Sequence, residues 1–216
     1  MPSVKGKKVL ITAGATYEPI DPVRFIGNRS SGKMGIAIAE TMQKAGAEVR
    51  LVCGPSNIKS SESINRIDVQ TAQEMFDEVM KHQSNSDILI LSAAVADYRP
   101  KTVANAKIKK KDSSLTIELE PTPDILATLG KQKTPSQLLV GFALETNNEL
   151  ENAKSKLKRK NCDLIVLNSL QDAGAGFGHD TNKVRILDRH NNISTFELKS
   201  KAEVANDILQ AIKDYK

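Results

Sequence analysis

The sequence predicts an α/β protein with a Rossmann-like, doubly wound, mostly parallel sheet, to which an antiparallel strap and a C-terminal hairpin are added. Short apolar runs of strand length alternate with segments of helical spacing through most of the chain, which is the pattern of βαβ units. No linker, repeat or low-complexity stretch divides residues 1–216. We therefore expect one domain, at the upper end of the usual size for a single domain.

The opening βαβ unit shows this alternation most clearly. Residues 7–13 (KKVLITA) read as a buried strand, and the small residues 14–16 end it, as a turn close to a ligand would require. A long loop at 17–29 separates this strand from a helix predicted at 31–45. A second strand follows at 48–53, where a Gly-Pro pair stops it.

The middle of the chain repeats the pattern. A short strand at 65–70 leads to a helix, 71–82, that Thr71 caps with Glu74 at the capping-box position. Residues 87–94 (DILILSAA) are apolar enough to form a central parallel strand. Asp97 follows at the carboxyl end, where open α/β sheets bind ligands, although Asp at a strand end is also an ordinary turn residue.

A lysine run, Lys107 to Lys111, precedes residues 114–119, which alternate like a half-exposed strand. We call residues 107–119 the strap. Its lysines can protect the edge of a sheet, or they can form a mobile basic arm that closes over a polyphosphate. Residues 122–124 (TPD) then predict the start of a helix. Thr122 would be the cap, Pro123 the first helical residue and Asp124 an acid in the first turn.

The last third supplies two more strands, 137–143 and 163–168, on either side of a polar helix that ends at Lys160. Lys156 and Lys160 share one face of that helix, which by itself indicates no more than a solvated surface. A Gly-rich loop, a hairpin and a closing helix complete the chain at residues 169–181, 182–198 and 201–215.

Residues 25–35 (FIGNRSSGKMG) are the stretch best suited to an anion, because amides, hydroxyls and two cations precede a helix N-terminus. Residues 27–33 have P-loop spacing, but Met34 stands where a P-loop holds Mg²⁺ with Ser or Thr. The dinucleotide fingerprint is absent, because the next glycine after Gly14 is Gly27. We interpret the stretch as a phosphate-handling loop of another lineage.

The composition favours a small anionic ligand. The net charge is +5 and the pI about 9.1, but no aromatic residues interleave with the lysines as they do in nucleic-acid binders, so no nucleic-acid partner is expected. Cys53 and Cys162 stand alone, which predicts buried thiols in a reduced, cytoplasmic protein. No signal peptide or apolar run of membrane length occurs, so no membrane partner is expected.

No covalent nucleophile or metal site stands out. His82, His179 and His190 are scattered, with neither a nucleophile elbow nor metal-ligand spacing. Amides, hydroxyls, lysines and backbone N–H groups remain. Such a set suits positioning and charge stabilisation in phosphoryl or nucleotidyl transfer.

Seven motifs together resemble a known family. They are residues 12–24 (TAGATYEPIDPVR), 28–35 (NRSSGKMG), 93–99 (AAVADYR), 107–110 (KIKK), 123–125 (PDI), 141–146 (GFALET) and 159–163 (RKNCD). In this order they closely resemble bacterial phosphopantothenoylcysteine synthetase, the CTP-dependent phosphopantothenate–cysteine ligase of coenzyme A biosynthesis, over nearly the whole chain. Many bacteria fuse this domain behind a flavin-dependent decarboxylase. This chain starts at the synthetase strand, so we expect the stand-alone form.

The resemblance implies a two-step reaction. The carboxylate of 4′-phosphopantothenate attacks the α-phosphorus of CTP, releasing pyrophosphate and leaving an acyl-cytidylate. The amine of cysteine then attacks the acyl group, giving 4′-phosphopantothenoylcysteine and CMP. Mg²⁺ is expected to bridge the triphosphate. The family forms homodimers in which the strap closes a site at the subunit interface.

The resemblance also implies residue roles. Asn28 matches the residue that binds the acyl-cytidylate and Lys107 the strap lysine that reaches the triphosphate, so both are expected to be catalytic. The Asn28 amide can offer a donor and an acceptor to the acyl carbonyl. Substrate contacts are expected from Asn28, from Arg29, which stands where other members can carry His, and from Ala94. Expected nucleotide contacts are Gly14, Ser30, Ser31, Gly32, Lys33, Ala93, Asp97, Lys107, Pro123, Asp124, Ile125, Phe142, Lys156 and Lys160.

Two other functions compete with the ligase. An NAD(P)-dependent reductase is suggested only by the opening βαβ unit, and the missing glycine fingerprint argues against it. A non-catalytic nucleotide-binding protein would bind CTP but release no pyrophosphate.

Overall fold

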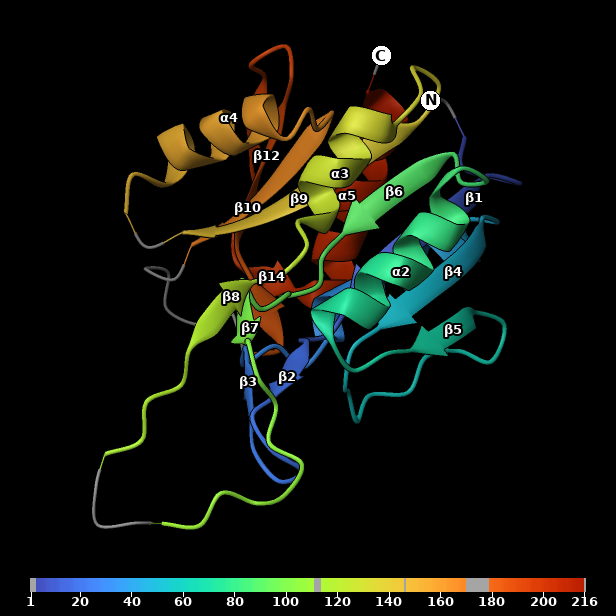
Figure 1. Cartoon of the computed structure of the whole chain (residues 1–216). Helices are drawn as coiled ribbons and strands as arrows, with labels where there is room; N and C mark the ends of the chain where they lie inside the picture. The colour runs from blue at the N-terminus through green and yellow to red at the C-terminus, as the bar shows by residue number, and fades with distance from the viewer. Residues whose placement is uncertain (1–2, 111–113, 146, 170–178, 216) are drawn as a thin grey trace.

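The computed structural model describes residues 3–110, 114–145, 147–169 and 179–215, in which helices cover both faces of a central eight-stranded sheet (Figure 1). Six neighbouring strands, from β10 to β5, are parallel, and the two at the other edge are antiparallel, which confirms the predicted class. In sheet order the strands are β13 (Ile193–Thr195), β12 (Val184–Asp188), β10 (Leu164–Ser169), β9 (Leu138–Glu145), β6 (Ile88–Leu91), β1 (Lys8–Ala13), β4 (Glu48–Cys53) and β5 (Asn65–Asp68).

The order of the parallel strands fixes where a ligand can bind. When the six parallel strands are numbered by their order in the chain and followed from β5 to β10, they run third, second, first, fourth, fifth, sixth. This is the strand order of a Rossmann fold. The order reverses between β1 and β6, which pair directly. Ligands of such sheets bind at this switch point, beyond the carboxyl ends of the strands.

Two helical layers bury the sheet. Helices α1 (Lys33–Lys44) and α5 (Lys201–Asp214) pack on one face, and α2 (Ala72–Gln83), α3 (Ile125–Gln132) and α4 (Glu149–Arg159) pack on the other. Successive strand residues point to opposite faces, so Ile11 and Ile90 join the first layer while Leu10 and Leu89 join the second. None of the helices in the described residues is long and apolar enough to cross a membrane.

The predicted helix start is confirmed at α2 and wrong in detail at α3. At α2 the Thr71 hydroxyl and the Glu74 carboxylate each accept the other residue's backbone N–H, which completes the capping box. At α3 the cap is Asp124, whose carboxylate accepts the N–H of Ala127 at 2.8 Å. Thr122 instead donates its hydroxyl to the Ala96 carbonyl. A tertiary contact therefore takes the side chain that local spacing assigned to the cap.

The strand predicted at 114–119 is also wrong. Residues 114–118 have no strand pairing, and only β8 (Leu119–Pro121) pairs, antiparallel to β7 (Tyr98–Pro100). Between them, residues 101–110 and 114–118 extend away from the body of the protein (Figure 1). The alternating pattern of apolar and polar residues does not by itself form a strand there, because a strand needs a neighbouring strand to share its backbone hydrogen bonds.

Other boundaries shift by a few residues. Strand β6 stops at Leu91 rather than Ala94, and α1 begins at Lys33 rather than residue 31. The hairpin is confirmed by the antiparallel pairing of β12 and β13, with Asn191 in the left-handed conformation (φ 66°). Most of the predicted Gly-rich loop, and Lys111 of the strap, lie outside the described residues.

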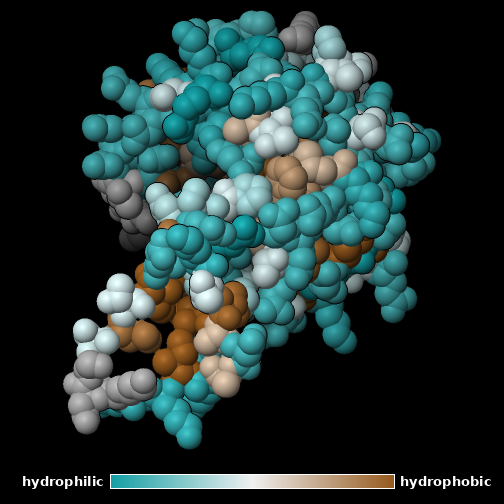
Figure 2. Space-filling view, viewed as in Figure 1, coloured by the Kyte–Doolittle hydropathy of each residue, from teal (hydrophilic) through white to brown (hydrophobic). Residues whose placement is uncertain are grey.

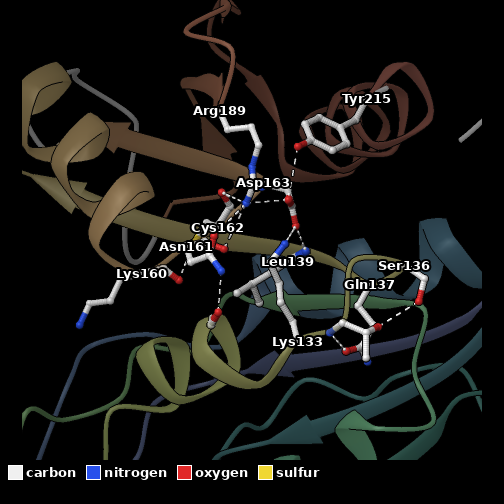
Figure 3. A network of polar contacts seen from close by, with 12 residues as sticks. Lys133, Ser136, Gln137, Leu139, Lys160, Asn161, Cys162, Asp163, Arg189 and Tyr215 are labelled. Atoms are coloured by element: carbon white, nitrogen blue, oxygen red, sulfur yellow. Dashed lines mark hydrogen bonds and ion pairs between the residues drawn. The ribbon is translucent and has the colours of Figure 1, made fainter.

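The buried carboxylate of Asp163 joins several C-terminal elements near the amino ends of β9 and β10 (Figure 3). One oxygen of Asp163 accepts from the Lys133 ammonium at 2.6 Å and from the Leu139 N–H at 2.7 Å. The other lies 2.9 Å from the Arg189 guanidinium and accepts from the Tyr215 hydroxyl at 3.3 Å. One side chain thus links the end of α3, the start of β9, the hairpin and the end of α5.

Candidate active site

A cleft of about 1020 Å³ opens beyond the carboxyl ends of β1, β6, β9 and β10, where the strand order predicts a ligand. The loop after β6, the start of α3 and one side of α4 form its walls. It is as large as typical small-molecule sites. The predicted site residues that line it are Asn28, Ala93, Ala94, Asp97, Pro123, Asp124, Ile125, Phe142, Lys156 and Lys160.

Hydrogen bonds to the loop after β1 and to Asn28 fix the loop after β6. The Ala94 N–H donates to the Gly14 carbonyl at 2.8 Å. The side-chain nitrogen of Asn28 donates to the carbonyl oxygens of Ala94 at 3.0 Å and Val95 at 3.1 Å. Carbonyl oxygens only accept, so both N–H bonds of the Asn28 amide are used by the protein. Its oxygen, rather than its nitrogen, is left to a substrate.

Charged side chains of α3 and α4 meet in the cleft. Lys160 forms an ion pair with Asp124. Burial opposes ionisation of Asp124, but the Lys160 ammonium and the Ala127 N–H outweigh it, so the pKa of Asp124 is lowered. Burial lowers the pKa of Lys156, and the Glu145 carboxylate partly offsets this. An anionic ligand at this wall would therefore find two lysines facing one acid of α3.

A second cavity, of about 50 Å³, adjoins the cleft beneath the start of α1. Asn168 and Phe142 line both spaces, so the two are adjacent and share a wall. Gly32 caps α1 with φ 82°, and a Cβ on it would lie 3.2 Å from the Cα of Gly14. A side chain at Gly32 would be strained as well as crowded. The predicted phosphate-loop residues Ser30, Ser31, Gly32 and Lys33 all line this cavity.

Three predicted residues line neither space. Gly14 lies beneath Gly32 and supports it, and Arg29 is exposed beside the loop. Lys107 is exposed on the extension between β7 and β8. In a single chain, then, the sequence-predicted catalytic pair of Asn28 and Lys107 is not brought together.

Several lining residues were missed from the sequence. Arg159 and Asn152 add polar groups to the cleft from α4, and Asn168 lines both cavities from the end of β10. Lys201, the first residue of α5, lines the smaller cavity. Only Asn168 carried a usable signal, as a polar residue at the carboxyl end of a predicted parallel strand.

Two buried acids of the long loop serve the scaffold. The Glu18 carboxylate accepts the Ala72 N–H at the start of α2, at 2.8 Å, a favourable place for a negative charge. Asp21 pairs with Arg24, whose guanidinium holds the pKa of Asp21 well below its usual range. Asp21 also accepts the N–H of Ile108 at 3.1 Å, so the loop anchors one end of the strap.

Neither cysteine suits nucleophilic chemistry. Cys53 and Cys162 are buried and unbridged. Burial raises the pKa of the Cys162 thiol to about 12, despite the nearby Lys156. Burial likewise raises the pKa of Cys53. Because the thiolate is the reactive form, both side chains act as small packing groups.

Comparison with known proteins places the chain in a family. Residues 4–215 match the family described as DNA/pantothenate metabolism flavoprotein C-terminal domain. The chain belongs to this family. It is 47% identical over 210 residues to the coenzyme A biosynthesis bifunctional protein CoaBC of Bacillus subtilis, covering 97% of the chain and 52% of the relative. The family resemblance drawn from the motifs is therefore confirmed.

A solved structure and a relative with a different name also match this chain. A solved C-terminal domain of CoaBC superposes with a TM-score of 0.84 at 43% identity, covering 99% of this chain and 97% of that domain. A relative from an unknown prokaryotic organism, named cysteine/cysteine sulfinic acid decarboxylase, is 57% identical over 97% of this chain and 58% of its own length. The chain thus spans little more than half of the curated relatives it matches.

The described residues hold no cluster of three His, Cys, Asp or Glu side chains arranged to bind a metal ion. The expected Mg²⁺ does not need one, because Mg²⁺ commonly keeps its waters and binds through substrate phosphates and one or two carboxylates. Asp97 and Asp124 line the cleft and could supply such carboxylates. The donor set therefore fits a metal that arrives with a nucleotide.

Proposed function

We propose that this chain is a CTP-dependent phosphopantothenate–cysteine ligase domain. It would join 4′-phosphopantothenate and cysteine through an acyl-cytidylate, with release of pyrophosphate and then CMP. One observation carries the proposal beyond family membership. A cleft large enough for a nucleotide lies directly beside a small, lysine-lined cavity at a helix N-terminus, which is suited to a phosphate group.

The first step brings two anions together, so the residues that lower their repulsion are the important ones. Lys156 and Lys160 line the cleft, and the residues at the start of α1 line the adjoining cavity. Bound Mg²⁺ would supply further positive charge on the phosphates. The protein's part is to position the carboxylate near the α-phosphorus and to stabilise developing charge.

The second step requires an amine to approach the acyl carbon of the cytidylate. Asn28 stands beside the loop after β6 with its amide nitrogen held by two carbonyl groups. Its oxygen can accept a hydrogen bond from the attacking amine as that nitrogen loses a proton. Asn28 would then orient cysteine, with the loop at Ala94 as the fixed surface behind the acyl group.

Lys107 enters this scheme through a second copy of the chain. It is exposed on the extension between β7 and β8 and does not line its own cleft. Large apolar side chains gather on the same part of the molecule (Figure 2), and those exposed there are Val23, Phe25, Tyr98, Val103, Leu115 and Leu119. Such a patch on a soluble protein commonly marks an interface. A homodimer would cover the patch and carry each strap toward the partner's cleft.

The name of the 57% identical relative bears on this assignment. The decarboxylase name belongs to the whole relative, and this chain matches 58% of that relative's length. Buried, protonated cysteines and a cleft lined by lysines and amides fit ligation by charge stabilisation. The reductase alternative loses its support, because the matched family covers the same βαβ unit that suggested it.

The test is an assay with phosphopantothenate, cysteine and one nucleotide at a time, following pyrophosphate, CMP and the amide product. CTP should give both pyrophosphate and product and should exceed ATP in kcat/KM. Binding of CTP without pyrophosphate release would support the non-catalytic alternative. Equal or better kcat/KM with ATP would refute the selectivity.

A further inference from the structure

The small cavity beneath α1 brings together two lysines from distant parts of the sequence. Lys33 is the first residue of α1 and Lys201 the first residue of α5, and both line the cavity. Lys201 is only 7% exposed. Its ammonium donates to the His179 carbonyl, and Lys33 forms an ion pair with Asp180. Both lysines therefore line one cavity, and their ammonium groups bind two consecutive residues beside it.

Three physical effects oppose this arrangement in the protein alone. Burial lowers the pKa of Lys201, and the neighbouring charge of Lys33 lowers it further, while Asp180 raises it. Each lysine also stands at a helix N-terminus, where the helix dipole disfavours a cation. A buried lysine and cations at helix N-termini are locally unfavourable, and such unfavourable features in a regular fold are expected at functional sites.

One phosphate group in the cavity would counteract these effects, because its negative charge would lie near two lysines that each begin a helix. The cavity of about 50 Å³ has room for a group of that size and shares Asn168 and Phe142 as wall residues with the cleft. The Asp180 carboxylate, 81% exposed, already holds Lys33 from the solvent side. An incoming phosphate would compete with it for the same cation.

We propose that Lys201 is a phosphate-binding residue of this site and that, with Lys33, it holds one phosphate group of a substrate in the small cavity. The inference rests on the proposed function for the identity of that substrate, which is either the nucleotide triphosphate or the phosphate of phosphopantothenate. Phosphate binding itself does not depend on catalysis.

The experiment compares wild type, Lys201→Met and Lys201→Arg by isothermal titration calorimetry with inorganic pyrophosphate, CTP and phosphopantothenate in separate titrations. Lys213→Met, in the last turn of the same helix, is the matched control. A lost charge-assisted hydrogen bond corresponds to about 10- to 100-fold weaker binding. We expect that loss in Lys201→Met, partial retention in Lys201→Arg and wild-type affinity in Lys213→Met.

The three probes separate the sources of the phosphate. Weaker binding of pyrophosphate and CTP with unchanged phosphopantothenate assigns the cavity to the nucleotide, and the reverse assigns it to the acid substrate. A folded Lys201→Met protein that binds all three probes like wild type overturns the proposal, as does wild-type protein that binds none of them. Pyrophosphate binding that depends on Lys201 in a protein without ligase activity would overturn only the proposed function.

A second variant keeps the test valid if Lys201→Met does not fold. Asp180→Asn removes the exposed carboxylate that competes for Lys33, and we expect pyrophosphate to bind about 3- to 10-fold more tightly, as for loss of one nearby like charge. Glu197→Gln, at another exposed acid before α5, is the control for the general change in charge and should have little effect. Equal affinity in Asp180→Asn and wild type would overturn the proposal.

Discussion

Replacing Asp163 with Asn tests how the C-terminal elements are fixed (Figure 3). The side chains of Asp163 and Lys133 are 6% and 7% exposed. Asn is nearly isosteric and keeps one oxygen for the Leu139 N–H, but it loses the charge that compensates the buried Lys133 ammonium. Its amide nitrogen would also face either that ammonium or the Arg189 guanidinium, and both of these groups only donate.

The size of the effect follows from burial. Removing one partner of a buried ion pair costs about 3–5 kcal/mol, because the other charge is left in a poorly solvated place. For a chain of this length, each kcal/mol lowers Tm by about 2–4 °C, so a fall of about 6–20 °C is expected. Asp87→Asn is the control, because its ion pair with Lys7 is about one-third exposed. Such partly exposed pairs contribute about 1 kcal/mol or less.

The measurement is urea unfolding followed by circular dichroism, with the double variant Asp163→Asn and Lys133→Met alongside. Met removes the stranded charge, so the double variant should recover part of the lost stability. The reasoning is refuted if Asp163→Asn loses less than about 1 kcal/mol, the range of surface pairs. It is also refuted if the double variant shows simple additivity, because the Lys133 charge would then not be the cause.

Four further predictions concern the site and the interface. Lys107→Ala should slow acyl-cytidylate formation on the order of 10²-fold, as for other lost charge-stabilising contacts; unchanged pyrophosphate release would mean that the strap lysine is only a solvated edge residue. Asn28→Asp should slow cysteine transfer more than activation, so quenched single-turnover reactions with labelled phosphopantothenate should show accumulated acyl-cytidylate; an equal loss of pyrophosphate release would contradict that assignment. Cys162, whose pKa is raised from 9.0 to about 12, has about 10³-fold less thiolate at pH 8 than an unshifted thiol, so it should resist a thiol reagent in the native protein and react in urea; fast native modification would contradict its burial. Phe25→Glu places a charge in the exposed apolar patch and should shift the chain toward monomer in analytical ultracentrifugation and lower ligase activity, whereas an unchanged mass would argue against that interface.

Family and fold class followed from the sequence because their signals are local. Strand and helix periodicity need only neighbouring residues, and so do capping boxes such as Thr71 with Glu74. The family was carried by ordered motifs such as residues 28–35. The same patterns failed at residues 114–119 and at Thr122, where pairing and capping depended on partners elsewhere in the chain.

The joint placement of the site groups was decided only by the tertiary structure. Sequence patterns assigned Lys33 to a phosphate loop but gave no reason to join it with Lys201, because the sheet order, not sequence distance, brings α1 and α5 onto one face. Likewise, the sequence allowed the Asn28 amide to donate to a substrate or to accept from it. The structure shows its nitrogen donating to two backbone carbonyl groups, which leaves the oxygen as acceptor. Composition and periodicity determine which elements form, whereas hydrogen-bond partners and like-charge contacts between distant segments exist only once those elements pack.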